Sequence, residues 1–141
     1  MSIVTSITQR LQAKQNALPI NSYLSPEIYA AEQNLFANAP KYVGHALMVP
    51  NSGDYYALDW MGNAKALLNQ NAEISLLSNV CRHRQAIMLS NRGNTQNIVC
   101  PIHRWTYDLN GKLLGAPRFD AKPCLNLDKT PLINWQGLLF E

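Results

Sequence analysis

Apolar residues in the first part of the chain recur at the three- and four-residue intervals of an amphipathic helix. Residues 3–18 show this spacing, which predicts a short first helix. Ser25 precedes Pro26 and Glu27, the order expected of an N-cap residue followed by proline at the first helical position. A second helix is therefore predicted to begin at Pro26 and to end before Pro40, because the residue before a proline disfavours helical geometry.

From about residue 41 the pattern changes to short runs that are apolar or alternate between apolar and polar residues. Pro50, Gly53, Gly62 and asparagine-rich turns separate these runs, which is typical of a β meander. An Asn-Gly pair in "DLNGKLLGAPRF" lies between short apolar segments and predicts a hairpin. The last segment, "LINWQGLLFE", predicts a further pair of strands.

The two patterns divide the chain into a helical N-terminal arm at residues 1–40 and a mainly β domain at residues 41–141. With 141 residues, the chain is long enough for one domain with a hydrophobic core. Hydrophobic residues make up 47% and charged residues only 15%, which indicates a globular rather than a disordered protein. The net charge of +3 is small and no run of Lys or Arg occurs, so the composition does not support nucleic-acid binding.

The cysteine content and the N-terminus favour a soluble cytoplasmic protein. Three cysteines cannot all pair, and such a small odd number is typical of a reducing compartment, where cysteine is a metal ligand or a buried apolar residue. The first sixteen residues lack the apolar core and the cleavage site of a signal peptide. No stretch approaches eighteen consecutive apolar residues, so no membrane span is expected.

Most of the metal-binding side chains are concentrated in the segment "NVCRHRQAIMLSNRGNTQNIVCPIHRWTY". They form a Cys-x-His motif and a Cys-x-x-His motif, which comprise Cys81, His83, Cys100 and His103. Structural zinc sites with two ligands of each kind usually pair Cys with Cys and His with His along the chain. Here each motif supplies one Cys and one His, which suits a [2Fe–2S] centre in which two histidines replace two cysteines on one iron. A zinc site stays open as the alternative.

The same segments resemble a known family. "CRH" and "CPIH", followed by "WTYDLNGKLLGAP", are similar to the Rieske domain of ring-hydroxylating oxygenase large subunits and of the related choline monooxygenase-like proteins. The resemblance extends to "YVGHALMVPNSGDYY" and "LINWQGLLFE" and so covers roughly residues 41–141. It implies a Rieske-type fold of antiparallel sheets, with a cluster-binding subdomain at about residues 78–120 and the helical arm before it.

The resemblance also implies one Rieske-type [2Fe–2S] cluster and the roles of its four ligands. Cys81 and Cys100 would bind the inner iron as thiolates, and His83 and His103 would bind the outer iron through one ring nitrogen each. Because neutral imidazole replaces anionic thiolate, the potential of such a centre lies above that of an all-cysteine cluster. Reduction adds a negative charge and makes the histidines more basic, so we expect the electron and proton equilibria to be coupled at high pH.

The function implied by the resemblance is the relay of single electrons from a ferredoxin or flavin reductase to a mononuclear iron in a catalytic domain. In the family that iron is held by two histidines and one carboxylate. Only His45 remains once His83 and His103 are assigned to the cluster, so we expect the catalytic domain to be absent and the sequence to be part of an oxygenase large subunit. A stand-alone Rieske ferredoxin and a structural zinc module are the alternatives. The family often forms trimers, so the parent is expected to be homo-oligomeric.

Several residues beside the ligands have a structural and a functional interpretation. Arg82, Arg84 and Arg104 are either solvated loop charges or a positive rim that attracts an acidic ferredoxin or reductase. Trp105 is expected to pack under the cluster loop. Tyr107 is either a core tyrosine or, like its counterpart in the family, a hydrogen-bond donor to a cluster sulfur.

The sequence departs from the family pattern within the two motifs. Gln85 and Arg104 stand where many members carry glycine, and a side chain there could strain the loops. Ala86 and Ile102 replace the disulfide-forming cysteines of respiratory Rieske proteins, and Trp105 replaces their cluster-bonding serine. Fewer donors stabilise the reduced form less, so we expect a potential on the order of −150 mV, at the low end of the Rieske range.

The remaining cysteine and histidine are expected to be structural. Cys124 has no second ligand near it in the sequence and is predicted to be a buried apolar residue. His45 lies in a predicted strand and is predicted to be a hydrogen-bonded structural histidine.

Overall fold

The computed structural model describes residues 19–121 and 123–141, so the helix predicted at residues 3–18 lies outside the described residues. The chain divides between Ala39 and Pro40 into two compact units, each described by itself. No helix among the described residues is both long and apolar enough to cross a membrane.

The described part of the first unit contains a 3-10 turn, η1 (Ile20–Tyr23), and one helix, α2 (Pro26–Asn38). The side chain of Ser25 caps α2 by accepting a hydrogen bond from the backbone N–H of Ile28 at 3.3 Å. The helix stops one residue before the Ala39-Pro40 bond, where proline excludes helical geometry. The prediction of this helix and of its cap is confirmed.

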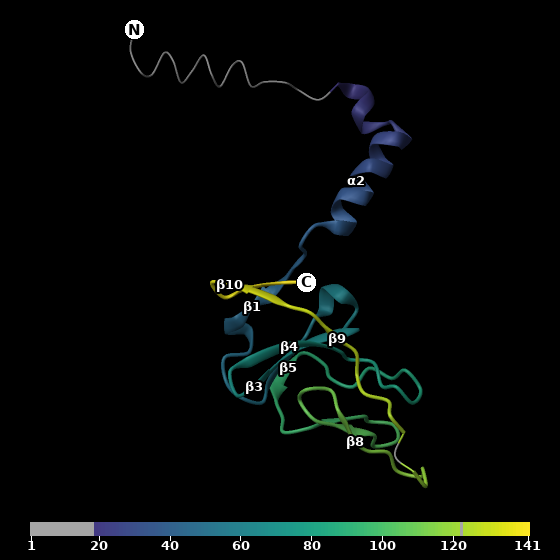
Figure 1. Cartoon of the computed structure of the whole chain (residues 1–141), viewed down its shortest axis with the longest axis vertical. Coiled ribbons are helices and arrows are strands. Elements are labelled where there is room, and N and C mark those ends of the chain that lie inside the picture. The colour runs from purple at the N-terminus through teal and green to yellow at the C-terminus, as the bar shows by residue number, and fades with distance from the viewer. Residues whose placement is uncertain (1–18, 122) are drawn as a thin grey trace, which may run out of the picture. The chain divides into compact units, whose positions relative to one another are not determined.

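The second unit consists of three antiparallel sheets (Figure 1). The first sheet has the order β1-β11-β10, and its strands are β1 (Tyr42–His45), β11 (Leu138–Phe140) and β10 (Ile133–Trp135). The second has the order β5-β2-β3-β4-β9, and its strands are β5 (Arg92–Asn94), β2 (Asp54–Ala57), β3 (Lys65–Gln70), β4 (Glu73–Ser78) and β9 (Lys129–Thr130). The third has the order β6-β7-β8, and its strands are β6 (Ile98–Val99), β7 (Thr106–Tyr107) and β8 (Leu113–Gly115). Two 3-10 turns, η2 (Ala46–Met48) and η3 (Asp59–Met61), connect strands of the first two sheets.

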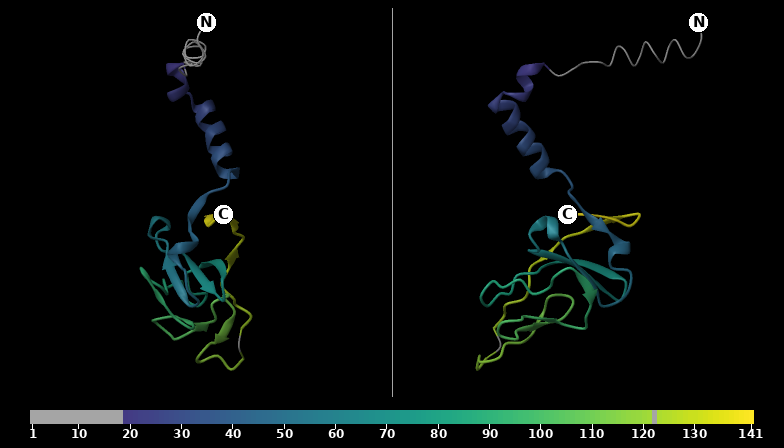
Figure 2. Two further views of the ribbon diagram at one scale, coloured as in Figure 1. Left: turned by 90° about the vertical axis from the view of Figure 1, so that its left-hand side faces the viewer. Right: turned by 180° about the vertical axis from the view of Figure 1, so that it is seen from behind.

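The five-stranded sheet forms the middle of the unit, with β10 and β11 at one end and β8 at the other (Figures 1 and 2). Its central strands β2, β3 and β4 are consecutive antiparallel neighbours, which confirms the predicted meander. Both faces of β3 are buried: Leu67 belongs to one core with Val43 and Leu139, and Leu68 to another with Trp105 and the two motif cysteines. A strand buried on both faces shows an apolar run instead of alternation.

Both predicted hairpins are present. β7 and β8 are joined by a turn in which Gly111 has φ +84°, and the Asp108 carboxylate accepts hydrogen bonds from the backbone N–H groups of Asn110 and Lys112. β10 and β11 are joined through Gln136 and Gly137, both with positive φ, as a tight hairpin turn requires. The mainly β fold with antiparallel sheets, predicted from the sequence, is confirmed.

Candidate metal centre

The two ligand motifs lie on two loops with the same backbone hydrogen bonds. In the first loop, the N–H of Cys81 donates to the carbonyl of Ala86 at 2.8 Å, and the N–H of Gln85 donates to the carbonyl of Cys81 at 2.9 Å. In the second loop, the N–H of Cys100 donates to the carbonyl of Trp105 at 2.8 Å, and the N–H of Arg104 donates to the carbonyl of Cys100 at 3.1 Å. Each cysteine is thus fixed by the residues four and five positions after it.

The residue four positions after each cysteine has a left-handed backbone. Gln85 has φ +57° and Arg104 has φ +62°, and these are the positions where the sequence departs from glycine. A side chain in this region costs roughly 1 kcal/mol relative to glycine, because its Cβ approaches the neighbouring carbonyl oxygen. The strain expected from the sequence is therefore present in both loops.

Replacing Gln85 with glycine is expected to stabilise the first loop by roughly 1 kcal/mol, because glycine adopts the left-handed backbone without strain. The measurement is the temperature at which the bound cluster bleaches on heating. The Gln85→Ala variant is the control, since alanine keeps the Cβ and should give no gain. Equal bleaching temperatures for the two variants would show that the backbone of Gln85 is not strained.

Both motif cysteines are buried at the base of the loops, where they are part of the hydrophobic core. Cys81 is 1% exposed and Cys100 is 2% exposed. Burial raises the pKa of the Cys81 thiol, and the neighbouring Cys100 side chain raises it further. A bound cation reverses this preference, because coordination deprotonates a thiol outright. The pair therefore has the burial and the proximity expected of thiolate ligands on one iron.

The two motif histidines lie side by side with their rings edge to face. Their ring centroids are 4.7 Å apart and their planes meet at 72°. The Nδ1 atom of each ring is buried and has no hydrogen-bond partner within the described part of the chain. Burial lowers the pKa of His103, and the positive charges of His83, Arg84 and Arg118 lower it further. The neutral ring is therefore favoured, and this is the form that binds metals. These unpaired Nδ1 atoms fit an outer iron.

The four motif side chains form a thiol pair and an imidazole pair. Among residues 19–121 and 123–141, no three Cys, His, Asp or Glu side chains converge as the ligands of a single metal ion would. A [2Fe–2S] centre takes two side chains on each iron and does not require such a convergence. The buried thiol pair and the imidazole pair match that division.

Two aromatic side chains pack against His83. Trp105, 1% exposed, stacks on His83 with ring centroids 5.0 Å apart and planes 6° from parallel. The ring of Phe119 packs edge to face against His83 and Trp105, with centroid distances of 5.8 Å and 5.2 Å. The sequence did not indicate Phe119, because it lies outside any strand and no periodic pattern marks it.

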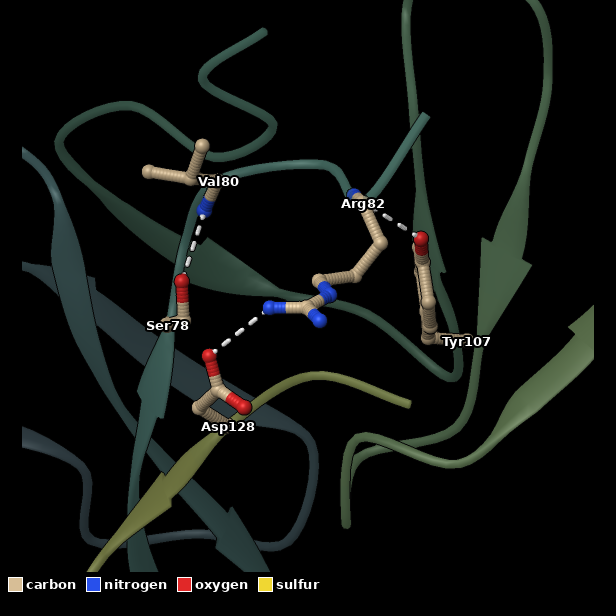
Figure 3. A network of polar contacts seen from close by, with 5 residues as sticks. All are labelled: Ser78, Val80, Arg82, Tyr107 and Asp128. Carbon is tan, nitrogen blue, oxygen red and sulfur yellow. Dashed lines mark hydrogen bonds and ion pairs between the residues drawn. The ribbon is translucent and has the colours of Figure 1, made fainter. Parts of the chain in front are cut away.

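Tyr107, on β7 after the second loop, contacts the first loop through its hydroxyl (Figure 3). Its hydroxyl lies 3.8 Å from Cys81 Sγ and accepts a hydrogen bond from the backbone N–H of Arg82 at 3.3 Å. Burial raises the pKa of Tyr107, so the phenol keeps its proton and has it available for the sulfur. The guanidinium of Arg82 turns to Asp128 and pairs with its carboxylate at 3.0 Å. Asp128 had no signal in the sequence, since it is 46 residues away from Arg82.

Replacing Tyr107 with phenylalanine is expected to lower the reduction potential of the bound cluster by roughly 40 mV. A hydrogen bond to a thiolate stabilises the more negative reduced state more, and a difference of about 1 kcal/mol corresponds to this shift for one electron. Redox titration followed by EPR measures it. Tyr56→Phe, a change of the same atoms on β2 in the other core, should leave the potential unchanged. An unaltered potential in Tyr107→Phe would show that the hydroxyl does not donate to the cluster.

The structural role predicted for His45 is present, whereas the burial predicted for Cys124 is not. His45 ends β1, and its Nδ1 accepts a hydrogen bond from the backbone N–H of Leu47 at 3.0 Å, so its structural role is confirmed. Cys124 is exposed, and the prediction that it is buried is wrong. It lies between β8 and β9 in a segment without strand structure, where the backbone does not turn its side chain toward a core.

Comparisons with known proteins agree with this arrangement. Residues 39–131 match the model of the Rieske [2Fe-2S] domain family. Putrescine 2-hydroxylases from Ralstonia nicotianae and Bordetella bronchiseptica are 52% and 45% identical to the chain, over 96% and 88% of its length. The crystal structure of naphthalene 1,2-dioxygenase from a Rhodococcus species matches with a TM-score of 0.67 and 28% identity, over 82% of this chain and 29% of that one.

The chain spans only about a third of the curated relatives it matches, 38% of the first and 33% of the second. The family match covers the larger part of the chain, including both ligand loops and all three sheets in part. The family carries a Rieske-type [2Fe–2S] cluster, and its role is electron transfer. The chain belongs to the Rieske [2Fe–2S] domain family.

Proposed function

We propose that the chain relays single electrons from a ferredoxin or flavin reductase to the mononuclear iron of an oxygenase. The observation that carries the proposal is the arrangement of the four motif side chains. The two thiols are buried in the core, while the two imidazoles are partly exposed and their Nδ1 atoms have no hydrogen-bond partner among the described residues. This gives one buried pair of ligands and one pair that reaches the surface.

In this proposal Cys81 and Cys100 hold the inner iron, and His83 and His103 hold the outer iron through Nδ1. The bound cluster would accept and release one electron at a time, at a potential above that of an all-cysteine cluster. Trp105 fixes the plane of the His83 ring by stacking, and Tyr107 holds its hydroxyl beside Cys81. The buried thiols exclude water from the inner side, so an electron is expected to leave through the partly exposed histidines.

The sequence does not contain enough histidines to bind the acceptor iron as well as the cluster. A mononuclear site of the oxygenase type needs two histidines and a carboxylate. With two of the three histidines on the cluster, only His45 is left, and its Nδ1 is hydrogen-bonded in the turn after β1. The acceptor is therefore a catalytic domain outside these 141 residues.

The substrate class is proposed from the similarity to relatives. Two matching proteins, at 52% and 45% identity, are putrescine 2-hydroxylases. We infer that the oxygenase served by this domain hydroxylates a small aliphatic diamine such as putrescine. Choline monooxygenase from Atriplex hortensis, at 29% identity, is a less similar relative, and it is named for choline.

The relay is tested by mixing the cluster-loaded chain anaerobically with a reduced plant-type ferredoxin and following the cluster absorbance. We expect one-electron reduction of each cluster, followed by reoxidation on addition of a catalytic partner that has oxygen and putrescine bound. A chain that holds its cluster but takes no electron from any protein donor would contradict the relay. If the electron is transferred but no hydroxylated putrescine forms, the relay is supported and the diamine is excluded as the substrate.

A further inference from the structure

Arg82, between the cysteine and the histidine of the first motif, is held at both its backbone and its side chain. Its backbone N–H donates to the hydroxyl of Tyr107 at 3.3 Å, and its guanidinium pairs with the Asp128 carboxylate at 3.0 Å (Figure 3). Arg84 and Arg104, the other arginines beside the motif histidines, take part in no ion pair within the described part of the chain. The charge of Arg82 therefore serves a contact inside the domain.

The hydrogen bond to the Tyr107 hydroxyl comes from the first loop alone. The residue after Cys100 in the second loop is Pro101, which has no N–H to donate. At 3.3 Å the bond from Arg82 is longer than the common N–H···O distance of about 2.9 Å, so it depends on how the first loop is held. The same hydroxyl lies 3.8 Å from Cys81 Sγ, so the position of Arg82 affects how the phenol faces this sulfur.

Side-chain packing does little to hold the first loop on the side of Asp128. A hollow of about 410 Å³ lies there, and the residues that line it are Ser78, Val80, Cys81, Arg82, Gln85 and Asp128. Open space supplies few atoms to pack against. The ion pair is therefore the contact that ties the Arg82 side chain to the residue before β9.

The backbone of Asp128 is fixed on both sides. Its carbonyl accepts a hydrogen bond from the N–H of Ser78 at 2.8 Å. Leu127 before it is 5% exposed, and its N–H donates at 2.8 Å to a carbonyl in the turn between β7 and β8. Lys129 after it begins β9 and pairs with Leu77 of β4. Exposed ion pairs usually gain little because two mobile side chains must be ordered, but here one partner starts from a rigid backbone.

We propose that Asp128 is a positioning residue for the cluster. Its carboxylate holds the Arg82 side chain, which keeps the Arg82 N–H against the Tyr107 hydroxyl and directs the phenol proton to Cys81 Sγ. The inference rests on the ligand assignment of the proposed function, and it adds a residue outside both loops that acts on a ligand of the inner iron. Because hydrogen bonds to the sulfurs favour the more negative reduced state, Asp128 raises the reduction potential.

The sign of the effect separates positioning from charge. A carboxylate near the cluster repels an added electron, so loss of its charge alone would raise the reduction potential. Loss of a positioning contact would lower the potential, because the hydrogen bond to the Cys81 sulfur weakens. The lowering cannot exceed that of Tyr107→Phe, since Asp128 acts through the Tyr107 hydroxyl.

The test is a redox titration of the cluster-loaded Asp128→Ala chain, followed by EPR. We expect a reduction potential below that of the wild type, by no more than Tyr107→Phe lowers it. Asp128→Glu, which keeps the carboxylate, should restore most of the wild-type value. Glu73→Ala is the matched control, because Glu73 forms a comparable exposed pair at 3.0 Å with Lys129, the residue after Asp128. It should not lower the potential.

Two further measurements distinguish positioning from a general loss of structure. In the Tyr107→Phe background, Asp128→Ala should no longer lower the potential, since the group through which Asp128 acts has been removed. The temperature at which the cluster bleaches should be the same for Asp128→Ala and Glu73→Ala, because exposed ion pairs contribute little to stability.

The outcomes separate this inference from the ligand assignment. An unchanged or raised potential in Asp128→Ala would overturn the positioning role, even though the cluster is bound. A lowering of the same size with and without the Tyr107 hydroxyl would overturn it as well, because Asp128 would then act by another route. Loss of the cluster in Asp128→Ala but not in Glu73→Ala would show a purely structural role and would also contradict the proposal. A wild-type chain that binds no iron and sulfide would contradict the ligand assignment itself.

Discussion

The Cys100→Ala variant is expected to contain neither iron nor acid-labile sulfide when it is produced and reconstituted beside the wild type. Cys100 is 2% exposed and belongs to the same core cluster as Cys81, so in the proposed assignment water has little access to its position on the inner iron. Fe–S clusters depend on thiolate ligands, and loss of one from a set of only two leaves one iron with a single protein ligand. The brown colour of the cluster should be lost.

The chain contains a matched control for this prediction. Cys124 is exposed and lies outside the two loops, so Cys124→Ala removes the same atoms without touching the site. It should keep wild-type iron and sulfide. A Cys100→Ala protein with the full cluster would show that the ligand assignment is wrong, and loss of the cluster in Cys124→Ala would show that the third cysteine takes part.

Replacing Trp105 with alanine is expected to destabilise the domain by about 3–5 kcal/mol, a large part of the 5–15 kcal/mol that stabilises an average domain. The indole is 1% exposed and packs between the ring of His83 and the core beneath the loops. Its loss leaves a cavity and removes the stacking partner that fixes the His83 ring. The half-life of the cluster absorbance at raised temperature measures the effect, since cluster loss makes unfolding irreversible.

Trp135→Ala is the control for the tryptophan substitution. Trp135 lies on β10 and is 60% exposed, so its removal should change stability by no more than about 0.5 kcal/mol. Equal half-lives for Trp105→Ala and the wild type would show that the indole does not support the site.

The elements that the sequence predicted are those with a strong local signal. Helix α2 has Ser25 and Pro26 at its start and Pro40 after its end, and the hairpins after β7 and β10 contain Asn-Gly and Gln-Gly turns. The meander of β2, β3 and β4 follows from runs of apolar residues separated by turns. The two Cys/His motifs are also local, because in each the cysteine and the histidine are only two or three residues apart, and their role as cluster ligands stays a prediction.

The features that the sequence did not predict depend on long-range contacts or on exposed segments. β5 (Arg92–Asn94) is fully exposed and carries no apolar residue, so its pairing with β2 has no signal in the pattern. Phe119 reaches the site from a segment without strand structure, and Asp128 pairs with Arg82 across 46 residues. Cys124 was expected to be buried because cysteine usually is, but burial depends on the local backbone.

The central claim is that the two Cys/His motifs hold a [2Fe–2S] cluster with thiolates on one iron and imidazoles on the other. The most direct measurement is the EPR spectrum of the dithionite-reduced wild-type chain, with iron, sulfide and zinc assayed on the same sample. We expect the rhombic signal of a Rieske centre, with equal amounts of iron and sulfide and no zinc. A sample that remains EPR-silent and binds zinc alone, even after reconstitution with iron and sulfide, would contradict the account.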